Sequence, residues 1–258
     1  MVGNIMHIQA LVFDLDGTAI PFSPDGMPSK RVIDAVKKAQ KLCHVSIATG
    51  RSYKATKAIM HALNIDDLCI LDGGASLYSC KTNQFVWKQE MDPILVQQVL
   101  FKVKKFGNYE VDDDREVPRE SLLTYHPVIP LCLICIYAVS KDEALEIVKI
   151  VKETSGLVAH AMGSWTIGKY DVHITHELAT KKHALQALLS RLNVDHKHVM
   201  VVGDGGNDLP LFELAGFKVA MGNAADELKK AADWIAPTVD EDGLAVAIEK
   251  YILHDTMS

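Results

Sequence analysis

The stretch LVFDLDGT, residues 11–18, decides the fold of this chain. A short apolar strand stops at two carboxylates, which places charge at the carboxyl end of a strand, where ligands bind in open α/β sheets. Because successive strand residues alternate faces, Asp14 and Asp16 are expected on the same side. Two neighbouring carboxylates repel each other, so the pair predicts a cation between them. A simple turn built from Asp and Gly is the alternative.

A second strand-like run, HVSIATGR at residues 44–51, also ends in polar groups. Thr49 offers a hydroxyl, Gly50 a backbone that a ligand can approach closely, and Arg51 a guanidinium. All three groups suit the oxygens of a phosphate. The end of this run therefore predicts a phosphate-binding segment.

A third such run, VMVVGDGGND at residues 199–208, ends in two more carboxylates, Asp204 and Asp208, with Asn207 between them. Hard oxygen ligands of this kind suit Mg²⁺, which takes few protein carboxylates and keeps waters or phosphate oxygens for the rest. Three strand ends are thus expected to converge on one magnesium site.

Apolar strand-like runs alternate with helix-periodic segments over residues 10–75, and the same alternation returns over 181–253. This pattern is typical of a parallel sheet with crossover helices. We predict an α/β fold whose core is a Rossmann-like, doubly wound parallel sheet.

The middle of the chain has a different pattern, with strand pairs around single helices between about residues 76 and 175. This pattern predicts an α+β module inserted into the first domain. The expected organisation is a discontinuous core of residues 1–80 and 178–258 and an inserted cap of residues 81–177.

Composition indicates an ordinary globular protein of 258 residues, with 48% hydrophobic and 23% charged residues. A net charge of −6 gives no overall attraction to nucleic acid or an anionic membrane, so an anionic ligand must be held locally. Five cysteines in apolar surroundings indicate reduced thiols and a cytoplasmic protein, and Cys132 with Cys135 has no second pair at zinc-ligand spacing. The sequence contains no run of about 18 apolar residues, so it predicts no membrane span.

The motifs together resemble the haloacid dehalogenase-like superfamily of phosphatases, in particular its Cof-type branch with an inserted type IIB α/β cap. The resemblance covers nearly the whole chain and rests on four motifs in order: DLDGT at 14–18, ATGR at 48–51, TKKHAL at 180–185 and GDGGND at 203–208. The final segment from Gly216 also looks like the closing segment of that family.

The resemblance implies that Asp14 is a nucleophile that forms an aspartyl-phosphate and that Asp16 is the general acid and base. Thr49 and Lys181 would then bind the phosphoryl oxygens. The further positions that the resemblance assigns are Gly50, Arg51 and Asn207 for phosphate, and Asp14, Asp16 through its backbone carbonyl, Asp204 and Asp208 for Mg²⁺ or its waters.

Three of these positions also have a purely structural interpretation. Lys181 lies beside Lys182 and could belong to the solvated first turn of a helix. Thr49 could cap the helix that begins near Ser52, and Arg51 could be a surface residue at that same helix start.

The chain departs from the family at Gly73, where relatives commonly have Asn, and around His173, His176 and Glu177, which precede Lys181. Substrate contacts in the cap therefore cannot be transferred from the family. The cap residues that could meet a substrate are the cluster DDDRE at 112–116, His160, Trp165, Lys169 and Tyr170.

The function expected from these observations is Mg²⁺-dependent hydrolysis of small phosphorylated metabolites such as sugar phosphates. The expected form is a monomer or weak homodimer without nucleic-acid or membrane partners. A phosphomutase that uses the same nucleophile and a non-catalytic metabolite-binding regulator are the two alternatives.

Overall fold

The computed structural model describes residues 7–106, 108–112 and 131–253. The chain divides into two compact units, one formed by Met1–Trp87 with Thr180–Ser258 and the other by Lys88–Ala179. Each unit has its own hydrophobic core. The first unit is assembled from both ends of the sequence, and the second is continuous.

A five-stranded parallel sheet forms the centre of the first unit, in the order β12-β11-β10-β1-β2. Its strands are β1 (Ala10–Phe13), β2 (His44–Ile47), β10 (Val199–Gly203), β11 (Phe217–Ala220) and β12 (Trp234–Ile235). All four residues of β1 are buried, which is typical of a strand that is covered on both faces. The predicted α/β fold with a parallel sheet is confirmed.

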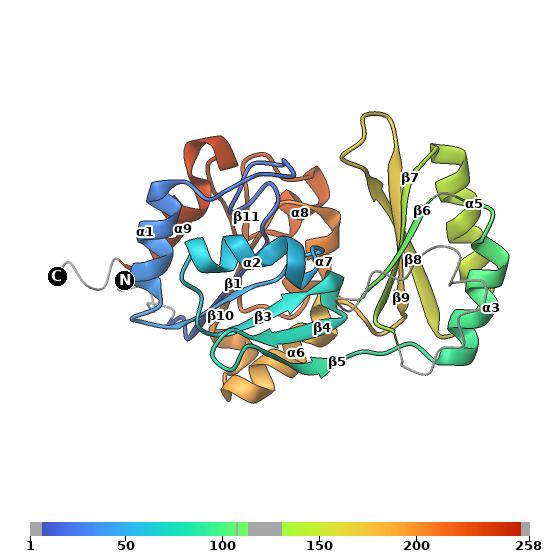
Figure 1. The fold of residues 1–258 in the computed structure, drawn as a ribbon. Coiled ribbons are helices and arrows are strands. Elements are labelled where there is room, and N and C mark those ends of the chain that lie inside the picture. Colours follow the sequence, from blue (N-terminus) through green and yellow to red (C-terminus); the bar gives the residue numbers. More distant parts are fainter. Residues whose placement is uncertain (1–6, 107, 113–130, 254–258) are drawn as a thin grey trace. The chain divides into compact units, whose positions relative to one another are not determined.

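Helices flank this sheet (Figure 1). They are α1 (Lys30–Ala39), α2 (Tyr53–Ala62), α6 (Lys181–Leu192), α7 (Leu209–Phe212), α8 (Asp226–Ala231) and α9 (Gly243–Tyr251). Helix α1 packs against α9, whereas α6 packs against α7. The apolar stripe of α1 explains its position, since Val32, Ala35, Val36 and Ala39 are its buried residues and follow helical spacing.

A second, three-stranded sheet completes the first unit, in the order β3-β4-β5. It contains β3 (Leu68–Leu71), β4 (Ser76–Ser79) and β5 (Gln84–Lys88), and a single parallel bridge from Ala48 to Ile70 links β3 to the segment after β2. The sequence placed the β4–β5 hairpin at the start of the inserted module. In the structure this hairpin pairs with β3, and the first unit extends to Trp87.

The second unit is a four-stranded antiparallel sheet with two helices. The strand order is β6-β7-β9-β8, with β6 (Asn108–Asp112), β7 (Leu133–Val139), β8 (Leu157–Gly163) and β9 (Tyr170–His176). The helices are α3 (Pro93–Val103) and α5 (Lys141–Lys152). Ser140 and Glu143 form a capping box at the start of α5, which satisfies backbone N–H groups there.

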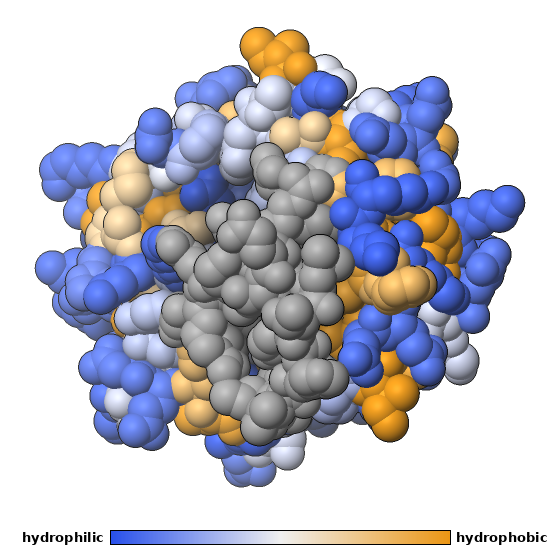
Figure 2. Space-filling model, turned by 45° about the vertical axis from the view of Figure 1, so that its right-hand side comes forward, coloured by the Kyte–Doolittle hydropathy of each residue, from blue (hydrophilic) through white to orange (hydrophobic). Residues whose placement is uncertain are grey.

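Hydrophobic residues also reach the surface, and Figure 2 shows orange atoms of such residues between blue hydrophilic ones. In the second unit the most exposed large ones are Ile94, Phe101, Leu145 and Ile167. No helix within the described residues is long and apolar enough to cross a bilayer. Cys132 and Cys135, the two cysteines with the spacing of a CxxC motif, are both buried.

Candidate active site

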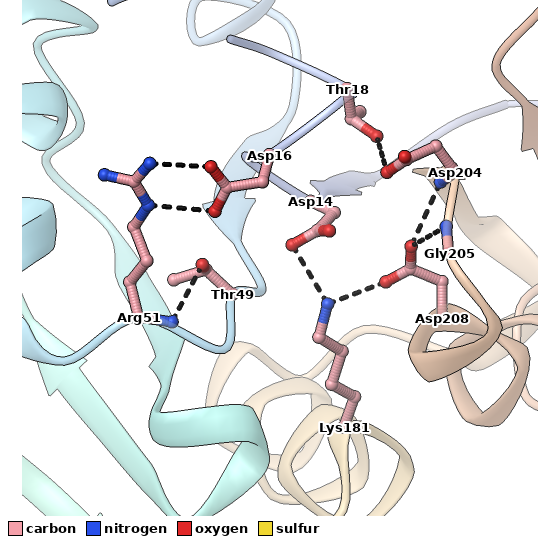
Figure 3. Close-up of polar contacts among 9 residues, drawn as sticks. All are labelled: Asp14, Asp16, Thr18, Thr49, Arg51, Lys181, Asp204, Gly205 and Asp208. Carbon is pink, nitrogen blue, oxygen red and sulfur yellow. Dashed lines mark hydrogen bonds and ion pairs between the residues drawn. The ribbon is translucent and has the colours of Figure 1, made fainter. Parts of the chain in front are cut away.

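The end of β1 carries a buried carboxylate that is paired with a buried lysine. Asp14 follows the last strand residue and is 5% exposed, and its backbone N–H continues the ladder to Val202. Lys181 Nζ donates to Asp14 Oδ1 (3.0 Å) and to Asp208 Oδ1 (2.7 Å), as Figure 3 shows. The ends of two neighbouring strands and the first turn of α6 therefore meet at one ammonium group.

Burial distinguishes Lys181 from its neighbour Lys182. Lys181 is the first residue of α6 and its side chain is 2% exposed, whereas the side chain of Lys182 is 37% exposed and pairs with Glu213. A cation at a helix N-terminus opposes the helix dipole, so the position needs compensating carboxylates. Asp14 and Asp208 provide them, and the interpretation of Lys181 as a solvated helix start is wrong.

Asp208 is fixed by backbone donors as well as by Lys181. Its Oδ2 accepts from the N–H groups of Asp204 (3.0 Å) and Gly205 (3.1 Å), and its side chain is fully buried. A Cβ at Gly203 would collide with this carboxylate, so the glycine that ends β10 makes room for it. Asp208 thus acts as the rigid link between Lys181 and the turn after β10.

Asp204 is positioned by the segment that follows Asp14. Thr18 Oγ1 donates to Asp204 Oδ1 (3.0 Å), and Thr18 is itself buried. Gly17 has φ +74°, and a Cβ there would overlap the Asp204 carboxylate. Asn223 holds this turn from the other side, since its Nδ2 donates to the Gly17 carbonyl (2.8 Å).

The sequence motifs alone did not indicate these positioning roles of Thr18, Gly17 and Asn223. Gly17 and Thr18 lie inside the DLDGT motif, so their closeness to Asp14 and Asp16 in the sequence could have indicated a role near the carboxylates. The long-range contact of Asn223, which is 206 residues from Gly17, had no such signal.

Asp16 has a different counter-ion. Arg51 holds both of its carboxylate oxygens, with Nε on Oδ2 (2.8 Å) and Nη2 on Oδ1 (2.6 Å). The strand ends at Phe13, so the chain has already turned when it reaches Asp16, and the two aspartates address separate cations. Lys181 is thus the cationic side chain that contacts Asp14, and Arg51 is the one that contacts Asp16.

Thr49 is buried at the end of β2, close to the same arginine. Its Oγ1 accepts from the backbone N–H of Arg51 (3.1 Å), and Ser52 occupies the N-cap position of α2. Thr49 is therefore not the cap of that helix. The space beside the Gly50 Cα is open, since a Cβ there would have no atom within 4 Å. Asn207 is exposed in the turn Gly206–Asp208.

The carboxylates of Asp14, Asp204 and Asp208 form a group whose ligand atoms lie within 4.8 Å of one another. Burial, together with Asp208, raises the pKa of Asp14 to about 8 and that of Asp204 to about 6. Burial alone would lower the pKa of Lys181, but Asp14 and Asp208 raise it above its usual value. The raised carboxyl pKa values reflect burial first and repulsion between the carboxylates second, and oxygen ligands at this spacing fit a divalent cation.

The loop after β3 approaches the start of α6. Gly74 has φ +109°, and a Cβ there would collide with the backbone of Thr180 and Lys181. Gly73 has φ +67° with open space around it. Asn tolerates this left-handed conformation better than most other non-glycine residues, so the backbone here is compatible with both Gly and the Asn that the family resemblance led us to expect.

Four of the cap residues expected to meet a substrate lie on β8, on β9 or in the turn between them. His160, Trp165 and Lys169 are exposed, whereas Tyr170 packs against the core of the second unit. His160 and His173 are directly opposite each other on β8 and β9. Of the cluster DDDRE, residues 113–116 lie outside the described residues, as do the side-chain contacts of Asp112.

Comparison with known proteins shows the family to which the chain belongs. The profile of the haloacid dehalogenase-like hydrolases matches residues 11–113 and 126–248. YkrA of Bacillus subtilis is 28% identical over 259 residues, which cover 95% of this chain and 98% of YkrA. Phosphoglycolate phosphatase 1 of Saccharolobus solfataricus is 26% identical over 246 residues, which cover 95% of this chain and 96% of that protein.

The same fold occurs in a solved structure described as the haloacid dehalogenase subclass IIB sugar phosphatase BT4131, with a TM-score of 0.73 and 21% identity. The match covers 93% of this chain and 98% of BT4131. The chain belongs to the haloacid dehalogenase-like hydrolase family. Its class within that family is the phosphatases, the phosphoric monoester hydrolases.

Proposed function

We propose that this protein is a Mg²⁺-dependent phosphatase that hydrolyses small phosphorylated metabolites through an aspartyl-phosphate on Asp14. The observation that carries the proposal is the buried contact of Lys181 with Asp14 and Asp208, beside Asp204. A buried lysine next to a nucleophilic carboxylate offsets the charge that otherwise prevents one anion from attacking another. Phosphoryl transfer depends mainly on such positioning and charge stabilisation.

In the first step, a carboxylate oxygen of Asp14 attacks phosphorus while the bond from phosphorus to the ester oxygen breaks. The leaving oxygen takes its proton from Asp16, so the alcohol departs neutral. Lys181 and Thr49 bind the phosphoryl oxygens in this proposal, with Gly50, Arg51 and Asn207 as the further phosphate-binding candidates. The products of this step are the alcohol and a phosphorylated Asp14.

In the second step, Asp16 accepts a proton from a water molecule whose oxygen attacks phosphorus. The bond between phosphorus and Asp14 breaks, which returns the Asp14 carboxylate and releases inorganic phosphate. Asp16 regains the proton that it gave in the first step, so the cycle balances.

The residues that would hold Mg²⁺ are Asp14, Asp204 and the backbone carbonyl of Asp16, with Asp208 next to them. Their fit rests on the close spacing of three carboxylates and on the raised pKa values of Asp14 and Asp204. When bound, Mg²⁺ neutralises charge on the phosphoryl oxygens.

We propose that the inserted unit selects the substrate by contacting its organic part. Two names support small phosphate esters as the class, since one relative is called a phosphoglycolate phosphatase and one structural neighbour a sugar phosphatase. The odd number of cysteines, most of them within apolar stretches, supports a cytoplasmic location.

The test is a panel of phosphate esters, assayed for phosphate release with Mg²⁺ and with a chelator, on the wild type and on Asp14→Asn. The proposal predicts release that needs both Mg²⁺ and Asp14. Full activity of Asp14→Asn would contradict it. Conversion of a sugar phosphate into an isomer without free phosphate would indicate a mutase, and binding without turnover would indicate a regulator.

A further inference from the structure

The Arg51 side chain connects its own segment after β2 with Asp16 and with the loop that contains Ser23 and Pro24. Its contacts are directed at these protein groups. Its guanidinium takes both oxygens of Asp16 at 2.6 and 2.8 Å. The side chains of Arg51 and Asp16 are only 11% and 18% exposed. A two-point arginine–carboxylate contact of this kind fixes orientation as well as distance, because the guanidinium is planar and rigid.

The same guanidinium also holds the loop that follows Asp16. Nη2 donates to the Ser23 carbonyl (2.8 Å), and Nη1 reaches the Pro24 carbonyl (3.4 Å). The Ser23 carbonyl also accepts from the Gly26 N–H (3.0 Å), which closes the turn. Arg51 is therefore a tie between the Asp16 carboxylate and the tip of the loop Pro21–Gly26.

This tie leaves Asp16 free to exchange a proton. A carboxylate offers about four lone-pair positions, and the two bonds from Arg51 use one on each oxygen. Asp16 can thus keep its orientation while a remaining lone pair faces a leaving group or a water. An unsupported aspartate would instead rotate about its side-chain bonds, and general acid–base catalysis depends on hydrogen-bond reach.

We propose that Arg51 is a positioning residue: it orients Asp16 for proton transfer and couples that orientation to the loop Pro21–Gly26. The inference rests on the proposed function, in which Asp16 carries the proton. It assigns Arg51 a role through Asp16, in place of the direct phosphate contact that the family motif suggested.

The two roles differ in how the loss of Arg51 depends on the leaving group. An alkyl ester needs a proton for its leaving oxygen, whereas dinitrophenol leaves readily without one. A positioning role through the acid predicts that Arg51→Ala slows formation of the phosphoryl-enzyme by about 100-fold or more for the alkyl ester, which is within the range of general acid catalysis. For dinitrophenyl phosphate the rate should stay within about threefold.

The experiment measures this first step by rapid quench under single-turnover conditions, for wild type, Arg51→Ala and Arg51→Lys. Lysine makes a point contact and lacks the rigid fork, so Arg51→Lys should recover only part of the alkyl-ester rate. The matched control is Arg31→Gln, because Arg31 makes the same two-point contact with Glu249, at 3.3 and 2.7 Å, on the outside of the same unit. Its rates should equal those of the wild type.

Three outcomes would overturn the proposal. One is an equal loss for both esters with a raised KM, which would make Arg51 a phosphate ligand. Another is an Arg51→Ala enzyme with wild-type rates. The third is unchanged hydrogen exchange of the backbone amides of residues 22, 23, 25 and 26 in Arg51→Ala, where the lost tie predicts faster exchange than in Arg31→Gln. An inactive wild type would count against the proposed function itself, and the exchange measurement tests the tie independently of activity.

Discussion

The two aspartates that follow β1 are only two residues apart, yet they lie in electrostatically different halves of the site. Asp14 shares one buried lysine with Asp208, and the Asp204 carboxylate lies within 4.8 Å of both, so three carboxylates stand beside a single ammonium group that contacts two of them. Asp16 is paired with Arg51 through both carboxylate oxygens, and the two side chains are 18% and 11% exposed.

The difference explains how one strand end can support two kinds of chemistry. The Asp14 half holds more negative charge than Lys181 can offset, which suits a divalent cation and a phosphoryl group. The Asp16 half is balanced in charge and held to a loop, which suits a group that must keep its orientation while it transfers a proton.

The largest effect is expected from Lys181→Met. Phosphate release should fall by at least about 1,000-fold, because charge stabilisation at the phosphoryl group is lost. The free energy of unfolding should fall by about 3 kcal/mol near pH 8, since a buried ion pair loses one partner. Activity assays and denaturant titration measure the two effects.

The matched control for this variant is Lys182→Met, which removes an exposed pair with Glu213 and should change stability by less than about 0.5 kcal/mol. Hydrogen exchange of residues 21–26 should be unchanged in Lys181→Met. A similar loss in both lysine variants would show that Lys181 has no special role.

The next prediction concerns pH and Mg²⁺. The folded-state pKa values of Asp14 and Asp204 are raised to about 8 and about 6, above the ordinary value of 3.8. At pH values between the ordinary and the raised pKa, the folded protein therefore binds more protons than the unfolded chain. Stability should therefore fall as pH rises from about 4 to 8 without divalent cations. Mg²⁺ binds the ionised carboxylates, so it should raise the melting temperature more near pH 8 than near pH 5.

Variants then show which half the metal ion uses. At a hundredfold excess over its Kd, Mg²⁺ should stabilise the wild type by about 2.7 kcal/mol. This gain should disappear in Asp204→Asn and persist in Asp16→Asn, because only the backbone carbonyl of Asp16 is a proposed ligand. Loss of the gain in both variants would break the division into halves.

How much of this was predictable from the sequence depends on the kind of contact. Parallel strands end at one edge, so the convergence of Asp14, Thr49 and Asp204 follows from strand patterns, and the parallel core sheet was predicted. The contact between Asp16 and Arg51 was not predicted. Alternation places Asp14 and Asp16 on the same side only while the strand continues, and β1 ends at Phe13. Local alternation cannot reveal where hydrogen bonding to neighbouring strands stops.

The hairpin of β4 and β5 illustrates the same limit at the level of the sheet. Its turn signal was visible in the sequence, but its attachment to β3 depends on which edge is free to pair. Lys181 shows the opposite case. Its own segment favoured a solvated helix start, and only the order of the family motifs indicated a role at the site.

Gly17 and Gly73 both have positive φ, but only Gly17 lies against a carboxylate of the site. Gly17→Ala should destabilise the protein by about 2 kcal/mol or more and weaken Mg²⁺ binding, because Gly17 combines φ +74° with contact against Asp204. Gly73→Asn should cost less than about 1 kcal/mol and keep activity, because φ +67° there comes with open space. Thermal unfolding and Mg²⁺ titration of both variants check this. Equal effects would contradict the account.

The smallest effect is expected from Thr18→Val, which removes the hydrogen bond to Asp204 at nearly constant shape. Stability should fall by about 1 kcal/mol. Mg²⁺ affinity should fall by about tenfold, since a residue that orients a metal ligand is lost. Calorimetric titration with Mg²⁺ measures the effect, and Thr18→Ser should restore affinity. No change in Thr18→Val would show that Asp204 is held by other contacts.

The central claim is that Asp14 becomes phosphorylated, and trapping that species tests it most directly. Asp16→Asn should slow breakdown of the intermediate, so acid quench after one turnover with dinitrophenyl phosphate should leave it intact for peptide mass spectrometry. We predict one phosphoryl group on the peptide that contains Asp14. Phosphate release at the wild-type rate with no modification of Asp14, or a phosphoryl group on another residue, would contradict the account.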